Sequence, residues 1–224
     1  MGSEIKSKEF DRIFQKLVQR TCKEWEYEFP GPDYFKSVYE RLPLGLQEII
    51  AYGFSSGLII DAGLSKSKSA GFRPVGVPEY KGPYSWFSRY NEEKQPWPNW
   101  EYYVQLSEYL RLYDAFKDKK VELRFEDDLM DIGIYREGNL WVCCEIKVES
   151  SQSKKLIRAI KTHQNAAELS LNDRGNDPLR KAKYIKKLKP QYFYLVSIGR
   201  RFEVRVEYPD NMQFKLVEDL VPFV

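Results

Sequence analysis

The sequence predicts an α/β fold in which a mixed β-sheet is flanked by helices. Three patterns indicate this fold class. Residues 129–149 alternate in polarity on both sides of a short polar turn, which is typical of a β-hairpin. Residues 99–116 and 152–171 place apolar side chains three and four positions apart, which is typical of amphipathic helices. Residues 191–198, with the sequence QYFYLVSI, have the composition of a buried strand.

The N-terminal region, residues 1–98, is expected to be mainly helical as far as residue 63. An apolar stripe favours a first helix, and two closely spaced prolines should end it. A later segment fits either a third helix or the approach to a strand, and the sequence leaves that choice open. The expected elements are a helix over 4–28, a helix over 33–41 with Asp33 as its N-cap, and the ambiguous segment 44–57, which in the second alternative leads into a strand over 58–61.

Residues 64–98 keep neither the helical nor the strand period for long, so we expect a long irregular loop. The loop is rich in glycine, proline and serine, and its aromatic rings are interleaved with basic side chains. Those rings would either stack on nucleic-acid bases or pin the loop to the core, and both interpretations stay open. The residues concerned are Trp86, Phe87, Tyr90, Trp97 and Trp100, with Lys81, Arg89 and Lys94.

The C-terminal region, residues 99–224, is expected to hold the sheet. Its strands should be centred on 120–148 and 191–217, with the N-terminal region packed against them. The expected elements are a helix over 99–116, a strand over 120–125, the hairpin over 129–149, a helix over 152–171, and strands over 191–198 and 201–207.

The predicted hairpin carries three charged residues, Asp131, Glu145 and Lys147, on one face. A three-residue loop centred on Gly138, with Asn139 in the left-handed conformation, makes Asp131 and Glu145 direct cross-strand partners. Their Cβ atoms would then lie roughly 5 Å apart. Lys147 would follow on the same face, about 7 Å along the strand. A two-residue loop would shift the register by one residue and break this arrangement.

Two interpretations of the charged face are open. It is either the solvated side of an ordinary amphipathic hairpin or a buried functional site. Tyr135, Trp141 and Cys143 alternate with the charges on the same predicted face, and a solvated face rarely carries that much apolar area. Burial of two carboxylates and an ammonium costs several kcal/mol unless it is compensated. A divalent metal ion would supply that compensation.

The stretch resembles the core of the PD-(D/E)XK nuclease superfamily over about residues 99–208. Asp131 matches the first acidic residue of the family motif, and Glu145-Ile146-Lys147 matches the E-x-K. Met130 stands where many members have a proline. The expected helices and strands also follow the family's order of helix, three strands, helix and strand. The resemblance implies a restriction-endonuclease-like fold and hydrolysis of phosphodiester bonds.

The resemblance also implies roles for individual residues. Asp131 and Glu145 would hold Mg²⁺, for which Mn²⁺ could substitute, with the backbone carbonyl of Ile146 as a further ligand. Lys147 would orient the attacking water and stabilise developing charge. Many members add a glutamate from the helix before the sheet, and some add a glutamine from the helix after it. Glu101, Glu108 and Gln164 are the matching residues, with surface-exposed side chains as the alternative interpretation of each.

Basic residues concentrate in residues 151–201. This segment has thirteen Lys and Arg against three acidic residues, a local balance of +10 in a chain whose net charge is +3. Such a segment next to the hairpin suits a phosphate backbone, and a solvated helix and linker is the alternative. The residues expected to bind nucleic acid are Lys154, Lys155, Arg158, Lys161, Lys181, Lys183, Lys186, Lys187, Arg200 and Arg201.

Composition excludes several other classes of function. The 224 residues contain no apolar run long enough to span a membrane, and the N-terminus lacks the apolar stretch of a secretory signal, so a cytoplasmic location is expected. Three cysteines make no disulfide framework. A single histidine, His163, argues against a zinc site and against catalysis that depends on histidine.

These observations favour a metal-dependent nuclease, in particular a DNA endonuclease of restriction, defence or repair type that acts on double-stranded DNA. Restriction-type members often dimerise, which makes a homodimer a candidate assembly. The first alternative is a catalytically inactive nucleic-acid-binding module on the same fold. A second alternative is a structural or protein-interaction domain whose basic segment meets an acidic partner.

Overall fold

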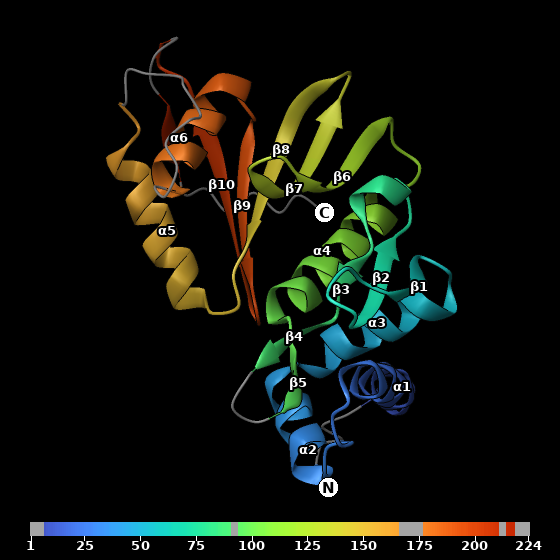
Figure 1. The fold of residues 1–224 in the computed structure, drawn as a ribbon. Coiled ribbons are helices and arrows are strands. Elements are labelled where there is room, and N and C mark those ends of the chain that lie inside the picture. Colours follow the sequence, from blue (N-terminus) through green and yellow to red (C-terminus); the bar gives the residue numbers. More distant parts are fainter. Residues whose placement is uncertain (1–6, 91–93, 166–176, 211–213, 218–224) are drawn as a thin grey trace, which may run out of the picture. The chain divides into compact units, whose positions relative to one another are not determined.

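The computed structural model describes residues 7–90, 94–165, 177–210 and 214–217 (Figure 1). The chain forms two compact units, residues 1–111 and 112–224. The boundary falls inside helix α4 (Trp100–Phe116), so this helix contributes to both units. The sequence analysis placed the division earlier, after residue 98, where the composition of the chain changes.

The first unit begins with three helices, followed by short strands in two small antiparallel sheets. Helix α2 has Gly31 as its N-cap and a proline at the first helical position, so the expectation that Asp33 would be the N-cap is wrong. Asp33 lies in the first turn, where its charge favours the helix dipole. The elements are α1 (Lys8–Trp25), α2 (Pro32–Arg41), α3 (Leu44–Ser55), β1 (Ile59–Leu64), β2 (Ala70–Pro74), β3 (Tyr84–Ser85), β4 (Phe87–Tyr90) and β5 (Gln95–Pro98), with a 3-10 helix over Glu79–Lys81.

The prediction of a long irregular loop over residues 64–98 is wrong, because strands β2 to β5 occupy much of it. These strands have two to five residues each, too few to show a period in the sequence. The rings of Trp86 and Phe87 are fully buried, and Trp86 packs on Phe72 with the ring centroids 4.3 Å apart. Trp97 remains 42% exposed. Most of the rings with described side chains therefore belong to the core of the first unit.

The second unit is built on a mixed six-stranded sheet, which confirms the prediction of an α/β fold with a mixed sheet over 120–148 and 191–217. The strand order is β11-β10-β9-β8-β7-β6, and only the β8–β9 pair is parallel. The strands are β6 (Val121–Asp127), β7 (Met130–Arg136), β8 (Asn139–Ile146), β9 (Tyr192–Ser197), β10 (Arg200–Glu207) and β11 (Lys215–Val217).

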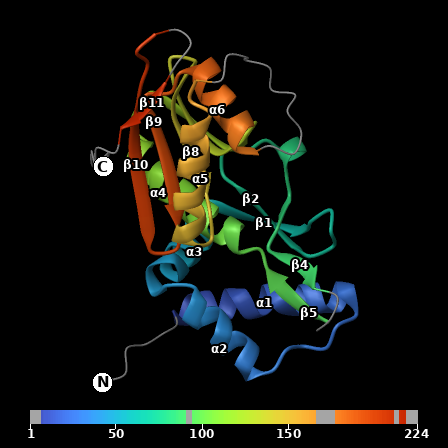
Figure 2. The same ribbon diagram turned by 90° about the vertical axis from the view of Figure 1, so that its left-hand side faces the viewer.

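Helices α5 (Ser150–Thr162) and α6 (Asp177–Leu188) lie side by side on one face of this sheet (Figure 2). Both helices contribute to one apolar core with the strands, through side chains such as Ile160, Ile185 and Phe193. Helix α6 lies where the sequence analysis recognised only basic charge. Helix α5 ends at Thr162 with His163 as its C-cap, earlier than the expected helix over 152–171, and residues 166–171 lie outside the described residues. None of the described helices has the length and apolarity that a membrane crossing requires.

Candidate active site

The β7–β8 hairpin has a two-residue turn in place of the expected three-residue loop. Glu137 and Gly138 both have positive φ, 51° and 77°, as in a type I′ turn, and Asn139 already pairs with Arg136 in the ladder. The register then shifts between Ile134 and Tyr135 because strand β8 contains a bulge. The extra residue thus lies in the strand and not in the turn.

The bulge restores the register that the charged residues need. Beyond it, Ile134 pairs with Val142 and Ile132 with Cys144, so one further step along the ladder brings Asp131 opposite Glu145. The short turn alone would have moved the two carboxylates to opposite faces. The bulge therefore compensates for the missing residue of the turn.

The bulge also changes which apolar side chains accompany the charges. Leu140 joins Cys143 in the core beneath α5 and α6. Trp141 instead contacts the ring of Phe116, with centroids 6.0 Å apart, and that of Tyr192. The expectation that Trp141 shares the charged face is therefore wrong for a local reason. The side chains between the turn and the bulge alternate out of phase with those beyond it.

Asp131 is held at the point where the β7–β8 ladder ends. Its Oδ2 accepts a hydrogen bond of 2.5 Å from the backbone N–H of Ile146, one residue beyond Glu145. Burial raises the pKa of the Asp131 carboxyl to about 8, and the neighbouring charge of Glu145 adds to this shift. The Ile146 N–H and the ammonium groups of Lys181 and Lys147 oppose it. Burial and a neighbouring carboxylate thus both disfavour the charged form of Asp131.

Glu145 is 2% exposed and is bound by two lysines. Lys147 donates to its Oε1 at 2.8 Å, and Lys181 from helix α6 donates to its Oε2 at 2.7 Å. Lys181 is itself 5% exposed and also donates to the carbonyl of Leu129 at 2.8 Å. Both carboxylate oxygens of Glu145 therefore have an ammonium partner. Lys181 was expected in an exposed basic segment, and its place in this site was not predicted, because the contact with Glu145 depends on how α6 packs.

A further buried acid, Asp127, follows the same face of the sheet. It is 4% exposed, and its Oδ2 accepts a hydrogen bond of 2.7 Å from the hydroxyl of Tyr135. A Cβ atom added to Gly133 would lie 2.1 Å from that oxygen. Glycine at position 133 therefore leaves the space that the Asp127 carboxylate fills. The pairing was not visible in the sequence because Asp127 belongs to the preceding strand.

The donor set of the site suits a hard divalent cation. Asp131 and Glu145 offer carboxylate oxygens, and Mg²⁺ is commonly held by one or two carboxylates with water completing its octahedron. Across the described ranges, no group of three or more His, Cys, Asp or Glu side chains is placed to hold a metal ion. The residues present thus fit a cation with two protein carboxylates, provided that Lys181 gives up its bond to Glu145.

The accessory residues suggested by the resemblance have other partners. Glu108, in the first unit, is 6% exposed and forms hydrogen bonds of 3.0 and 3.1 Å with Arg111. Glu101 is exposed in the first turn of α4, also in the first unit. Gln164 donates to the carbonyl of Lys161 at 2.8 Å and accepts from the N–H of Leu216 at 3.4 Å, which ties the end of α5 to β11.

The predicted nucleic-acid-binding residues separate into two groups. On α5, Lys154, Lys155 and Arg158 are exposed and Lys161 is half-buried, while Lys187 and Arg200 are exposed elsewhere. On α6, by contrast, the side chains of Lys181, Lys183 and Lys186 are buried. Arg201 lies over the ring of Tyr194 and pairs with Glu203 at 3.1 Å. Only the first group presents its charge to solvent, because burial withdraws the three α6 lysines from the surface.

Comparisons of the chain with protein-family models, with curated proteins and with solved structures find no match.

Proposed function

We propose that this chain is a Mg²⁺-dependent nuclease, in particular a DNA endonuclease of restriction, defence or repair type. The observation that carries the proposal is the pair of carboxylates, half-buried Asp131 and buried Glu145, brought together on neighbouring strands with Lys147 bound to Glu145. An acid whose pKa is raised to about 8 gains from a metal ion, because the ion favours the charged form of the carboxyl group.

The order of the elements supports a restriction-endonuclease-like fold. Helix α4 precedes the antiparallel strands β6, β7 and β8, helix α5 follows, and β9 then pairs parallel to β8. This is the order of the PD-(D/E)XK core, with α6 added between α5 and β9. The acidic residues also lie on the second and third strands, where the family motif requires them.

In the proposed mechanism, Asp131 and Glu145 hold the cation, and the backbone carbonyl of Ile146 is a candidate third protein ligand. Bound Mg²⁺ would lower the pKa of its water and neutralise charge on the phosphate. The Ile146 N–H orients the Asp131 carboxylate, because it already donates to Oδ2. Lys147 holds a proton on Nζ, half-buried, where it can orient the attacking water and stabilise a phosphate oxygen.

One observation favours the second candidate function, a catalytically inactive nucleic-acid-binding module. Lys181 already places a buried ammonium on Glu145, so the site carries an internal cation that could stand in for a metal. A structural ion pair of this kind would leave the fold intact without any cofactor. The two candidate functions thus differ in whether a divalent ion displaces the Lys181 ammonium from Glu145.

The deciding experiment measures cleavage and metal binding on the same preparations. Supercoiled plasmid, single-stranded DNA and RNA are incubated with the protein in Mg²⁺, in Mn²⁺ and in EDTA, beside Asp131→Asn. Metal binding is followed independently through the paramagnetic resonance signal of free Mn²⁺. Asp131→Asn is the matched control because it removes one charge and keeps the shape of the side chain.

Cleavage that needs metal and disappears in Asp131→Asn would support the nuclease, and the preferred polymer would identify the substrate. Absence of Mn²⁺ binding, together with retained DNA binding, would instead support the inactive module. Cleavage that persists in EDTA would contradict both candidates.

A further inference from the structure

Helix α5 and strand β10 form the walls of a groove on the second unit. The cavity has a volume of about 540 Å³ and is lined by Lys154, Ile157, Arg158, Lys161, Phe202, Glu203 and Val204. Its apolar side is continuous with the core, because Ile157 and Val204 are buried and Phe202 packs against them. The volume is sufficient for one or two nucleotide units.

Three of the lining side chains are cationic and share one face of α5. Lys154, Arg158 and Lys161 are four and three residues apart, so they project from successive turns of the helix. They span about 10 Å of helix axis. One strand of duplex DNA carries a phosphate about every 3.4 Å of its axis, so the row can face two or three consecutive phosphates.

The acidic residue in the groove does not cancel these charges. Glu203 lies in a strand, and its Oε1 is 3.1 Å from Nε of Arg201, which neutralises it locally. Within the described part of the chain, neither Lys154 nor Arg158 has an acidic partner. The face of the groove formed by α5 therefore keeps an uncompensated positive charge beside an apolar floor.

We propose that this groove binds the phosphodiester backbone of the nucleic acid, with the ammonium and guanidinium groups on phosphates and Phe202 against the sugar. The proposal rests on the proposed function for its choice of ligand and adds the path of the strand. The groove begins in the second turn of α5, seven residues after Lys147. The start of the groove therefore lies only a few residues along the chain from the end of β8 that carries the candidate active site.

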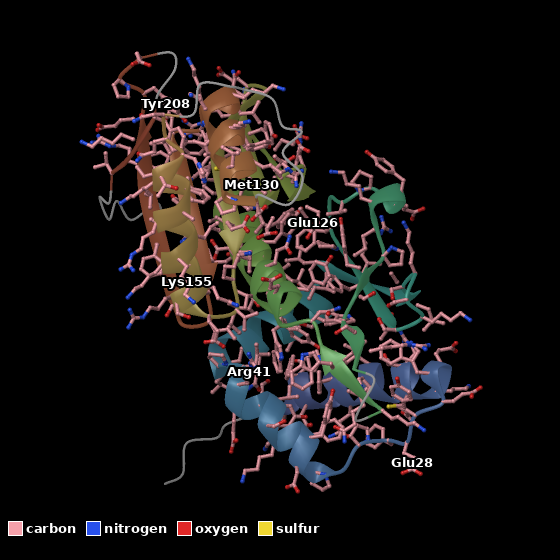
Figure 3. The ribbon with its side chains drawn as sticks, turned by 60° about the vertical axis from the view of Figure 1, so that its left-hand side comes forward. Glu28, Arg41, Glu126, Met130, Lys155 and Tyr208 are labelled. Atoms are coloured by element: carbon pink, nitrogen blue, oxygen red, sulfur yellow. The ribbon has the colours of Figure 1, made fainter. Side chains whose placement is uncertain are left out.

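The test measures the binding of a fluorescent 20-base-pair DNA duplex by fluorescence anisotropy in EDTA, where no cleavage can occur, at several salt concentrations. The test variant is Lys154→Gln/Arg158→Gln, which removes two groove charges and keeps most of both side-chain stems. Lys120→Gln is the contrast variant, because Lys120 is an exposed cation of the second unit that does not line the groove. Lys155, an exposed cation on α5 (Figure 3), is kept in both variants. Polyglutamate serves as a competing polyanion without phosphates.

The expected result is a loss of affinity of at least about tenfold at 0.1 M salt for the double variant, with the slope of log K against log salt reduced by about 2. Lys120→Gln should change the affinity less than about twofold. An equal effect of Lys120→Gln, an unchanged slope in the double variant, absence of DNA binding by the wild type, or equal competition by polyglutamate would each contradict the proposed role of the groove. Absence of cleavage would not, since binding in EDTA is independent of catalysis.

Discussion

The two units bury polar groups of different kinds. In the first unit, Gln47 is completely buried. Its side-chain amide donates a hydrogen bond to the carbonyl of Leu42 at 2.7 Å and accepts one from the N–H of Ser7 at 2.9 Å. In the second unit, the buried polar groups Glu145 and Lys181 are charged and bind each other, and each has one further hydrogen-bond partner. The buried polar side chains of the first unit are thus mostly neutral, with Glu108 as a charged exception, whereas the second unit holds opposite charges together in its interior.

This difference indicates which polar residues serve the fold. A neutral amide that satisfies free backbone groups stabilises the native state, because those groups would otherwise be buried without a partner. A buried ion pair contributes little net stability, since desolvation offsets the attraction. The charged residues of the second unit are therefore the ones whose presence calls for a function.

Replacement of Lys147 by alanine should abolish cleavage and leave the fold intact. We expect a fall in the single-turnover rate of at least about 10³-fold, because the lysine acts on charge that develops in the transition state. The circular dichroism spectrum should stay that of the wild type. Lys120→Ala, which removes an exposed lysine just before β6, is the control. Full activity of Lys147→Ala would remove this residue from the site.

In the first unit, Phe14→Ala should reduce stability without a comparable effect on chemistry. Phe14 is fully buried and packs against Phe10, Tyr39 and Phe87, among other rings. The loss of packing should lower the free energy of unfolding by about 3–5 kcal/mol. Urea denaturation followed by tryptophan fluorescence measures it. A loss below about 1 kcal/mol would show that this ring cluster is not a core.

Replacement of Lys181 by methionine should lower stability in EDTA by about 2 kcal/mol, because Glu145 loses one of its charged hydrogen bonds. The loss is smaller than that for an unpaired buried charge because Lys147 still binds the carboxylate. If the site takes a metal, Mg²⁺ should raise the melting temperature of this variant more than that of the wild type. Equal shifts in both proteins would favour the inactive module. Lys120→Met controls for the loss of charge.

The stability of the metal-free protein should depend on pH through Asp131. Its folded pKa is about 8, whereas an unfolded aspartate titrates at about 3.9. Between these values the folded state binds more protons than the unfolded state, so stability falls as pH rises, by at most about 1.4 kcal/mol per pH unit. The difference in unfolding free energy between the wild type and Asp131→Asn, measured in EDTA from pH 5 to pH 8, isolates this contribution. A difference that rises with pH would contradict the assignment.

The smallest effect is expected for an ion pair on the surface of the first unit. Arg20 and Asp61 form hydrogen bonds of 2.5 and 2.8 Å, but their side chains are 36% and 44% exposed. Arg20→Ala should cost only about 0.2–1 kcal/mol, and less at high salt. Thermal unfolding at low salt and at 0.5 M NaCl would show this. If Arg20→Ala lowered the free energy of unfolding as much as Lys181→Met, exposed and buried charges would not differ in their effect on stability.

Long or strongly patterned elements could be predicted from the sequence. Strands β6 to β10 were located to within a few residues because their apolar runs and alternation are local properties. Strands β2 to β5 were missed because they are too short to show a period. Helix α6 was missed because basic residues interrupt its apolar stripe, and three of them are buried against the expectation for lysine.

The candidate site was predictable only in part. The placement of Asp131 and Glu145 on one face follows from strand alternation. The expected three-residue loop was wrong, but it gives the same pairing of the two acids as the two-residue turn with its bulge. Lys181 could not be assigned, because its contact with Glu145 joins residues 36 positions apart and depends on how α6 packs on the sheet. The bulge could not be predicted from the sequence either, because polarity alternates without a break through Trp141.

The compensation between turn and bulge has a consequence for how such a hairpin can diverge. A hairpin with a three-residue turn and a regular strand presents Asp131 and Glu145 in the same way as the hairpin with a two-residue turn and a bulge at Trp141. Both outlines have the same number of residues between the two acids, so substitutions that favour one turn or the other can exchange them without an insertion or a deletion. With the residue count unchanged, the two-residue turn without the bulge would place the two acids on opposite faces of the hairpin. Turn and bulge must therefore change together if the two carboxylates are to stay side by side.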